Sequence, residues 1–216
     1  MVSMVSTESL PATNVAPSMF VYRDRPRRRA VRRAVDLVLT SLAMPLVIPL
    51  LAGACAAIAL EDGRPFVFRQ RRVGRFERTF TIYKLRTMRK DLCGDEVKPA
   101  SGRDPRVTRV GAILRKLSID ELPQLFNVLR GDMTLVGPRP EMPFLVKKYE
   151  KWQNLRHLVT PGLTCIWQTT CRSTIPLHKP EATVLDLAYI ESQTLLLDLR
   201  ILGNTFTSVI GTKGAH

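Results

Sequence analysis

Leu117-Ser-Ile-Asp-Glu-Leu-Pro-Gln-Leu-Phe-Asn-Val-Leu-Arg-Gly-Asp-Met-Thr-Leu-Val-Gly-Pro-Arg-Pro-Glu141 is the most informative stretch of the chain. It opens with two adjacent carboxylates, Asp120 and Glu121, and closes on a rigid Gly-Pro-Arg-Pro turn. Between them, apolar residues recur at the spacing of a helical face: Leu122, Leu125, Phe126 and Leu129. We expect this helix to begin at Asp120, because Pro123 then lies in the first turn, where its missing N–H is not needed.

The acidic pair has a structural and a functional interpretation. Ser118 and Glu121 match the Ser-x-x-Glu capping box, in which Glu121 would only cap the helix. The position of Pro123 argues against this, because a helix capped by Ser118 would lose a hydrogen bond there. With both carboxylates at the helix start, the helix dipole favours their ionised form. Exposed N–H groups at the same end favour a bound phosphate.

Four basic residues are candidate phosphate ligands: Lys84, Arg86, Arg115 and Arg139. The first two are spaced to share a strand face, and Arg139 is held between two prolines. Carboxylates beside arginines often form plain salt bridges, so this alternative stays open. The same groups also suit phosphoryl chemistry, because an ionised carboxylate can attack phosphorus while cations neutralise the transferred group. A neighbouring carboxylate with phosphate oxygens can hold Mg²⁺.

Composition restricts the partners of this chain of 216 residues, whose net charge of +14 implies an anionic one. No aromatic residues interleave with basic strands in an RNA-binding pattern, so a membrane partner is favoured and nucleic acid is not. The chain has no Walker A or Gly-x-Gly-x-x-Gly signature. Its four cysteines form no Cys-x-x-Cys pair, which favours reduced thiols over a zinc site.

The N-terminal part divides into a disordered tail, 1–22, and a basic flank with an apolar helix, 23–62. Between Ala34 and Leu60 the only charge is Asp36, and about 20 apolar residues suffice to cross a bilayer. Two prolines, Pro45 and Pro49, break the segment, and arginines flank both ends. Because basic flanks stay in the cytoplasm, we predict a re-entrant helix with acidic lipids around its arginines. A buried core helix is the alternative.

Residues 63–216 form one predicted domain of α/β (α+β) class, mostly helical with a small β-hairpin. The hairpin is expected over residues 65–88, and helices over 107–117, 144–157 and 181–191, the second of them amphipathic. A strand-like piece follows Thr160. The last apolar stretch, 195–210, is cut by charges and is either core or an interfacial helix on the membrane surface.

Several motifs then occur together and in a fixed order: Arg33-Ala-Val-Asp36, Phe68-Arg-Gln-Arg-Arg-Val-Gly74, Tyr83-Lys-Leu-Arg-Thr-Met88, Leu114-Arg-Lys-Leu-Ser-Ile-Asp-Glu-Leu-Pro-Gln-Leu-Phe-Asn-Val-Leu-Arg-Gly-Asp-Met133 and Leu135-Val-Gly-Pro-Arg-Pro140. The combination resembles the bacterial sugar transferase family, the monotopic phosphoglycosyl transferases that initiate exopolysaccharide and related glycan synthesis. The resemblance runs from about Arg28 to Ile210.

This resemblance implies a reaction and assigns roles to residues. Such enzymes transfer a sugar 1-phosphate from a UDP-sugar to undecaprenyl phosphate at the cytoplasmic face of the bacterial inner membrane, releasing UMP. Asp120 matches the nucleophile, which carries a covalent phosphosugar, and Glu121 matches the Mg²⁺ ligand. Lys84 and Arg115 would contact phosphate, and Arg139 would lie by the nucleotide. Pro49 matches the break of the re-entrant helix.

The chain departs from the family pattern at two positions, one in the helix break and one in the half that faces the sugar, and the second leaves the sugar open. Ile48 stands where many members have Ser, and Cys171 stands where many have Gly. We favour a hexose, with an N-acetylhexosamine as the alternative and a non-catalytic basic membrane scaffold as the alternative from another class. A homodimer is kept as a partner hypothesis.

Overall fold

The computed structural model describes residues 22, 25–90, 104–170 and 175–210. The predicted disordered tail, except Tyr22, and the departure at Cys171 lie outside these residues. Helices dominate the described chain, and its strands form two small two-stranded sheets. The predicted class, mostly helical with a small hairpin, is confirmed.

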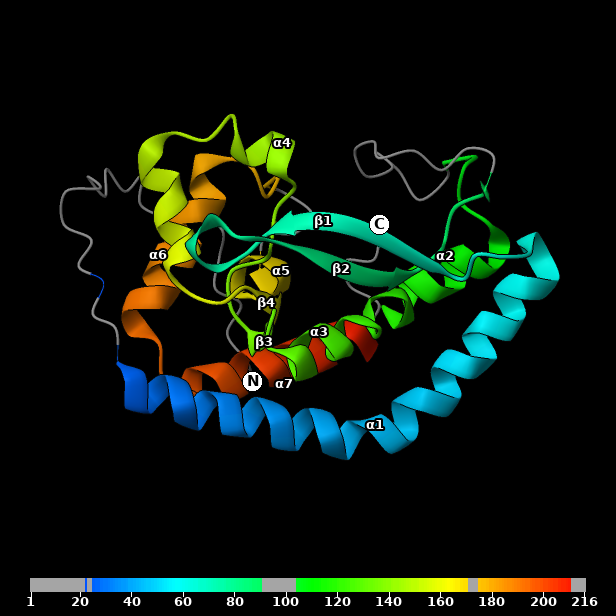
Figure 1. Cartoon of the computed structure of the whole chain (residues 1–216), viewed down its shortest axis with the longest axis horizontal. Helices are drawn as coiled ribbons and strands as arrows, with labels where there is room; N and C mark the ends of the chain where they lie inside the picture. Colours follow the sequence, from blue (N-terminus) through cyan, green and yellow to red (C-terminus); the bar gives the residue numbers. More distant parts are fainter. Residues whose placement is uncertain (1–21, 23–24, 91–103, 171–174, 211–216) are drawn as a thin grey trace, which may run out of the picture.

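The first helix, α1, comprises Pro26–Asp62 and is 37 residues long, or about 55 Å at the usual rise per residue. Figure 1 shows it along the lower edge of the molecule, bent near its middle. Pro45 and Pro49 are its interior prolines. Each lacks an N–H and pushes against a preceding carbonyl, which accounts for the bend.

α1 is long and apolar enough to cross a membrane, judged by length and composition. Its most apolar window of 18 residues is only 22% buried within the protein. A core helix would bury most of this surface, so the protein itself leaves the apolar side of α1 uncovered, including Leu42 and Leu46. The re-entrant topology stays a prediction.

Two arginines of the basic flank, Arg32 and Arg33, are bonded to the protein body. Arg32 donates to the carboxylate of Asp198 (2.7 Å), the carbonyl of Val136 (2.8 Å) and the hydroxyl of Tyr189 (2.6 Å). Arg33 donates to the last carbonyls of a short helix, α3 (Gln124–Arg130), with 2.7 Å to that of Leu129. These bonds fix the N-terminal half of α1 to the body.

Asp36 makes the third such attachment. This buried carboxylate accepts from the hydroxyl of Thr134 and from the backbone N–H of Leu135, at 3.1 Å. At the other end of α1, Glu61 accepts from the N–H groups of Arg109 (2.8 Å) and Val110 (2.9 Å). These two residues begin the helix α2 (Arg109–Lys116), so α1 is attached to the rest of the chain at both ends.

The hairpin is confirmed, with β1 (Val67–Val73) antiparallel to β2 (Thr79–Leu85). Its register pairs Val67 with Leu85 and Val73 with Thr79. A 3₁₀ turn, η3 (Arg75–Glu77), joins the strands. The pairing continues past β2, because the N–H of Arg86 donates to the carbonyl of Phe66 at 2.8 Å.

The second sheet pairs β3 (Thr134–Val136) with β4 (Gly162–Thr164) in parallel. The chain between them holds α4 (Pro143–Val146) and a 3₁₀ helix, η6 (Lys151–Leu158). The single amphipathic helix predicted over 144–157 is therefore wrong. Glu150 caps a new helical start by exchanging hydrogen bonds with Gln153, which divides the segment in two.

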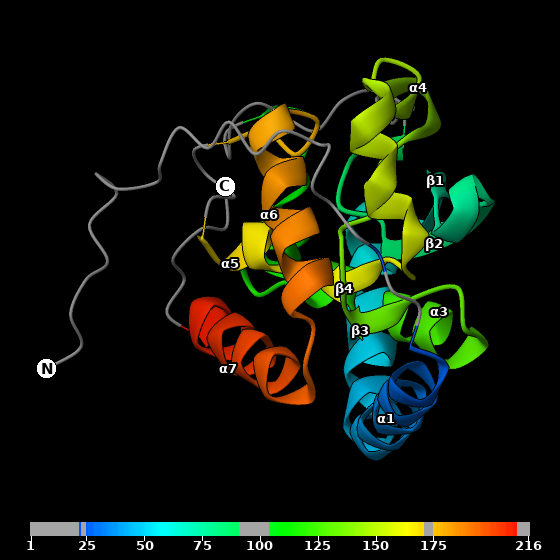
Figure 2. The ribbon, with the colours of Figure 1, turned by 90° about the vertical axis from the view of Figure 1, so that its left-hand side faces the viewer.

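Three helices complete the fold: α5 (Ile166–Thr170), α6 (Pro180–Ser192) and α7 (Leu195–Ile210). The strand-like piece predicted after Thr160 is thus limited to β4, while the helix predicted over 181–191 is confirmed by α6. Figure 2 shows α7 and α1 along the same lower side of the molecule. The main apolar core lies inside, and among its buried members are Val128, Met133, Val136, Tyr189 and Ile201.

α7 combines the two alternatives for the C-terminal apolar stretch. Asp198 and Ile201 are buried and bind it to the core. Leu196, Leu199 and Phe206 are more than half exposed, which leaves an apolar face on the outside. Such a helix suits an interface between protein and membrane.

The close approach of the two short parallel strands yields a stability prediction. A Cβ on Gly162 would collide with the backbone nitrogen and oxygen of Gly137. Backbone atoms cannot turn away as side chains can, so Gly162→Ala should lower the free energy of unfolding by about 3 kcal/mol. Thermal unfolding of the detergent-purified variant and of the unaltered chain measures this loss of stability.

Gly53→Ala is the matched control, because nothing lies within 4 Å of a Cβ at this position in α1. It should leave stability unchanged or raise it by up to about 1 kcal/mol, since Ala favours helix. Equal unfolding midpoints for the two variants would show that β3 and β4 tolerate a wider separation.

Candidate active site

The acidic pair lies in a single 3₁₀ turn, η5 (Ile119–Glu121), between α2 and α3. Ser118 precedes it with a left-handed φ of 55°, which redirects the chain, and its side chain caps nothing. The helix thus begins at Gln124 and not at Asp120 as expected, with Pro123 at the N-cap position. The capping box was rightly rejected, but the carboxylates do not belong to the helix that follows them.

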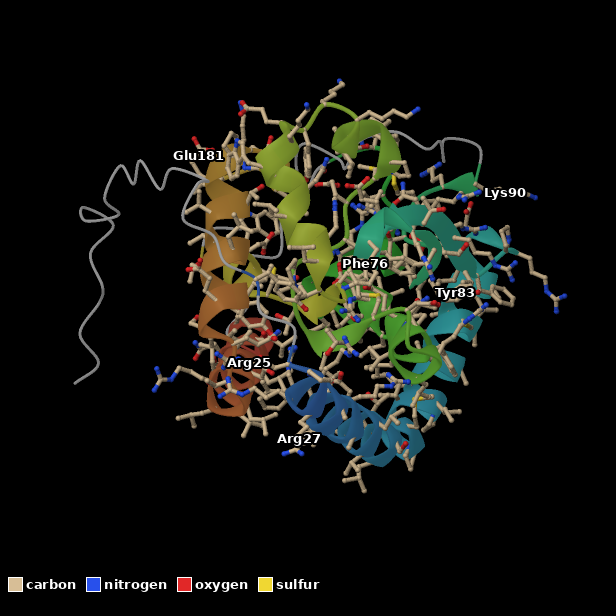
Figure 3. The ribbon with its side chains drawn as sticks, turned by 60° about the vertical axis from the view of Figure 1, so that its left-hand side comes forward. Arg25, Arg27, Phe76, Tyr83, Lys90 and Glu181 are labelled. Atoms are coloured by element: carbon tan, nitrogen blue, oxygen red, sulfur yellow. The ribbon has the colours of Figure 1, made fainter. Side chains whose placement is uncertain are left out.

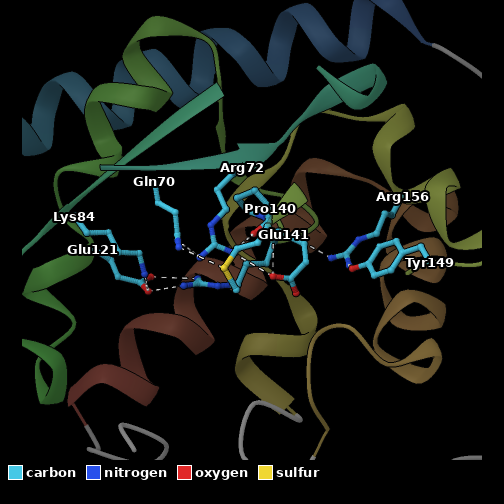
Figure 4. A network of polar contacts seen from close by, with 10 residues as sticks. Gln70, Arg72, Lys84, Glu121, Pro140, Glu141, Tyr149 and Arg156 are labelled. Carbon is cyan, nitrogen blue, oxygen red and sulfur yellow. Dashed lines mark hydrogen bonds and ion pairs between the residues drawn. The ribbon is translucent and has the colours of Figure 1, made fainter. Parts of the chain in front are cut away.

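Glu121 is buried between two cations that come from distant parts of the chain. Lys84, on β2, donates to its Oε1 at 2.9 Å. Arg139, from the Pro-Arg-Pro turn, donates Nη1 to Oε2 at 3.2 Å and Nη2 to Oε1. Figure 4 shows Glu121 beside Lys84 at one end of a polar network. The ion pairs are well shielded from water, since every participating side chain is at most 16% exposed.

Asp120 differs from its neighbour because its carboxylate makes no hydrogen bond within the described chain. Burial raises its pKa, and the charge of Glu121 raises it further. Lys84, Arg115 and Arg139 oppose this rise by stabilising the ionised form. The expectation that a helix dipole would govern this carboxylate is therefore replaced by a balance between burial and three nearby cations.

Arg115 and Arg86 have different surroundings, although both were predicted to bind phosphate. Arg115 donates to the hydroxyl of Thr87 at 2.7 Å and lies near enough to act on Asp120. Arg86 donates to the carboxylate of Asp62 at 2.8 Å and to the carbonyls of Asp62 and Gly63, both at 2.9 Å. The structure therefore brings Arg115 to the acidic pair and uses Arg86 at the end of α1.

Gln168 is a site residue that the sequence argument missed. It lies on α5 and accepts from Nη1 of Arg139 at 2.7 Å, so it helps to orient the guanidinium against Glu121. The sequence pattern around Gln168 indicates this role only weakly, since a lone polar residue after an apolar strand is common.

Arg156 is a second missed residue, and it supports the Pro-Arg-Pro turn from behind. It donates to the carbonyl of Arg139 at 2.9 Å and to the hydroxyl of Tyr149 at 2.8 Å. It also pairs with Asp186 on α6 at 2.6 Å, and both side chains are at most 3% exposed. Figure 4 shows Arg156 and Tyr149 at the end of the network opposite Glu121.

Arg72, on β1, holds the same turn from the hairpin side. Its Nη1 donates to the carbonyl of Pro140 and to the carboxylate of Glu141, both at 3.2 Å. Burial lowers its pKa to about 10, which still leaves it protonated at neutral pH. The turn is therefore fixed from two sides, and Arg139 is preorganised against the acidic pair.

Comparison with known proteins identifies the family of the chain. A model of the family described as bacterial sugar transferase matches residues 27–212. The chain belongs to the bacterial sugar transferase family. The resemblance inferred from the motifs is thereby confirmed.

Three relatives show which named proteins this chain is similar to. The UDP-glucose:undecaprenyl-phosphate glucose-1-phosphate transferase of Caulobacter vibrioides is 42% identical over 192 residues, which cover 86% of this chain and 72% of the relative. The UDP-N-acetylgalactosamine-undecaprenyl-phosphate N-acetylgalactosaminephosphotransferase of Aeromonas hydrophila is 37% identical over 190 residues, 86% of this chain. The exopolysaccharide production protein ExoY of Rhizobium meliloti is 34% identical over 209 residues, 89% of this chain.

The relatives differ in how much of their length this chain spans. It covers 45% of the Aeromonas relative, or about half, and 91% of the Rhizobium one. The shared region is the one that holds α1, the acidic pair and the Pro-Arg-Pro turn, since the family match runs from 27 to 212.

A magnesium ion is compatible with the donor set at this site. The described residues contain no group of three or more His, Cys, Asp and Glu side chains that could enclose a metal. Mg²⁺ does not need one, because it is usually held by one or two carboxylates together with substrate phosphates. Glu121, the ligand that the family resemblance indicates, supplies one such carboxylate.

The buried pair behind the turn yields a second stability prediction. Asp186→Asn keeps the size of the side chain but leaves Arg156 buried without its counterion. Removing one partner of a buried pair is costly, so the free energy of unfolding should fall by about 3 kcal/mol or more. Asp132→Asn is the matched control, because its pair with Arg130 is long (3.6 Å) and the Arg130 side chain is 70% exposed. It should cost less than about 1 kcal/mol. Equal losses in denaturant titrations would contradict the assigned support.

His157 yields a prediction for acidic pH. Burial, and then Arg156, lower its pKa to about 4 from 6.5, so the unfolded chain binds this proton more readily than the folded one. Stability must therefore fall as the pH drops below 6.5. From pH 6.5 to 4.5 this contributes a loss of about 2 kcal/mol. His157→Phe keeps the stacking on Tyr149 and should remove that part of the pH dependence.

The control for this prediction is His178→Phe, since His178 is exposed. Unfolding free energies are compared across the same pH range for both variants and the unaltered chain. A wild-type slope in His157→Phe would mean that other groups cause the acid sensitivity.

Proposed function

We propose that this protein transfers a sugar 1-phosphate from a UDP-sugar to undecaprenyl phosphate, releasing UMP, through a covalent intermediate on Asp120. The observation that carries the proposal is the contrast between the two adjacent carboxylates. Glu121 is engaged by Lys84 and Arg139, whereas Asp120 has no hydrogen bond from the described residues and lies among three cations. A half-buried, unengaged carboxylate in a cationic site is suited to attack phosphorus. The names of the relatives support the same reaction class.

The first step is a displacement at the phosphorus that bears the sugar. An oxygen of Asp120 forms a bond to the β-phosphorus of the UDP-sugar, and the bond from that phosphorus to the oxygen bridging to the α-phosphate breaks. UMP leaves with the bridging oxygen, and the sugar phosphate remains as an acyl phosphate on Asp120. Lys84, Arg115 and Arg139 would stabilise the negative charge of the diphosphate during this step.

The second step regenerates the carboxylate. A phosphate oxygen of undecaprenyl phosphate attacks the same phosphorus, and the bond to Asp120 breaks. The product is undecaprenyl diphosphate bearing the sugar. Two displacements by this route return Asp120 to its initial state, so the enzyme turns over without a further reactant.

Glu121 would hold Mg²⁺ when the donor is bound, which leaves Asp120 for the attack on phosphorus. The ion would supply positive charge to the diphosphate and to the leaving UMP. Lys84 and Arg139 are both bonded to Glu121, so this carboxylate would keep the two cations in place until the substrate enters.

The donor sugar is proposed to be a hexose. The Caulobacter relative, named for glucose, has the higher identity and is matched over more of its length than the Aeromonas relative, named for N-acetylgalactosamine. An N-acetylhexosamine is the alternative supported by that second name. The proposed location is the cytoplasmic face of the bacterial inner membrane, with α1 re-entering on the same side.

The nucleophile is tested by Asp120→Asn in the purified full chain. UMP release is measured with a panel of UDP-hexoses and UDP-N-acetylhexosamines, with and without undecaprenyl phosphate. The variant should lose at least about a thousandfold in rate, because an amide is not a nucleophile towards phosphorus. Asp132→Asn serves as the matched control and should retain activity. The panel also identifies the sugar.

Two outcomes would contradict the proposal in different ways. UMP release by Asp120→Asn at the wild-type rate would remove Asp120 from the role of nucleophile. A wild-type chain that bound membranes but released UMP from no donor in the panel would favour a non-catalytic scaffold. A single burst of UMP without acceptor, with labelled sugar phosphate retained on the denatured chain, is the expected signature of the intermediate.

A further inference from the structure

A cavity lies away from the acidic pair, beneath the N-terminal end of α1. Its volume is about 420 Å³, and its walls come from the start of α1, the η3 turn, the segments before β3 and β4, and the end of α6. None of Asp120, Glu121, Lys84 and Arg139 lines it. This size suits a small ligand or a headgroup. The transfer reaction proposed above uses none of the residues that line this cavity.

The lining of this cavity is strongly basic. Two carboxylates and six arginines contribute to it. The arginines are Arg25, Arg28, Arg29, Arg32, Arg33 and Arg75. One carboxylate, Asp36, is already satisfied by Thr134 and Leu135, and the other, Glu191, is exposed. The positive charge therefore exceeds what the cavity itself neutralises, and it favours an anionic occupant.

Two of the arginines are available to such an occupant. The side chains of Arg25 and Arg28 have no ion pair or hydrogen bond with any described residue. Arg32 and Arg33 are held by bonds to the protein body and provide a fixed positive wall behind them. Figure 3 labels Arg25 and Arg27 at this end of α1, at the lower side of the molecule. A guanidinium offers several N–H groups in a plane, a geometry that matches phosphate oxygens.

Apolar surface adjoins the cavity, which distinguishes a lipid from a soluble anion. Gln193 belongs to its lining, and the exposed Leu195 and Leu196 follow directly at the start of α7. On the other wall, the exposed Val31 and Leu37 of α1 flank the lining arginines. An amphiphile can therefore place a phosphate among the arginines while its chains lie against both helices, which run along one side of the molecule (Figure 2).

We propose that this cavity is a discrete binding site for the phosphate-bearing headgroup of an acidic lipid. The site combines a basic pocket with apolar surface on α1 and α7, the two parts that such a molecule requires. It differs from a diffuse attraction of the basic flank to the membrane, because only the arginines that line the cavity contribute. It would hold the N-terminal end of α1 at the headgroup level independently of the reaction.

The test measures lipid-dependent stabilisation of the full chain purified in a zwitterionic detergent at about physiological salt. Short-chain phosphatidylglycerol, phosphatidylcholine of the same chain length, and inorganic phosphate are titrated separately, and the thermal unfolding midpoint is followed. Arg28→Ala is compared with Arg27→Ala, an adjacent exposed arginine that does not line the cavity. Both variants lose the same charge, and neither loses a described contact.

Phosphatidylglycerol should raise the midpoint saturably, and Arg28→Ala should raise the half-saturating lipid concentration about fivefold, while Arg27→Ala changes it less than about twofold. The double variant Arg25→Ala/Arg28→Ala should give a still larger increase in the half-saturating lipid concentration.

Equal effects of Arg27→Ala and Arg28→Ala, or equal stabilisation by phosphatidylcholine, would overturn the site. An Arg28-dependent shift with inorganic phosphate alone would overturn the lipid as its occupant. UMP release is not part of this readout, so its outcome is independent of the proposed reaction.

Discussion

The arrangement of the candidate active site depends on the ion pairs between Glu121 and its two cations, Lys84 and Arg139. Two adjacent carboxylates in a shielded site repel each other, and burial disfavours the charge of both. Glu121 takes up the two cations directly, while Asp120 feels them only through space. One carboxylate is thereby fixed and the other is left accessible. A division of roles between identical chemical groups follows from their contacts alone.

The same arginine-rich composition serves a different purpose at α1. A net charge of +14 is expected to act on anionic partners, yet Arg32, Arg33 and Arg156 point into the protein. Their multiple planar donors bond to backbone carbonyls at β3, α3 and the Pro-Arg-Pro turn. Charge in this family member is therefore partly structural. Net charge alone overstates how much of it faces the membrane.

Local patterns explain which features were predictable. The hairpin and the bend at two prolines follow from short-range spacing. The start of α3 was misplaced because Ser118 adopts a left-handed conformation that its residue type does not announce. Gln168 and Arg156 were missed because their roles arise from contacts with Arg139, at separations of 29 and 17 residues. Arg86 shares a strand face with Lys84 in sequence, but the end of α1 captures its guanidinium.

The attachments of α1 connect the membrane segment to the chemistry. At its N-terminal half, Arg32 and Asp36 fix it to β3 and α7; at its C-terminal end, Glu61 caps α2, the helix that carries Arg115. Both ends are thus bonded to the protein body, while the bent middle exposes leucines such as Leu42 and Leu46. A bilayer that takes up those leucines would position α2 and the acidic pair at a fixed height above it. A lipid phosphate could then meet the site without leaving the membrane, which is the geometric condition for the second displacement.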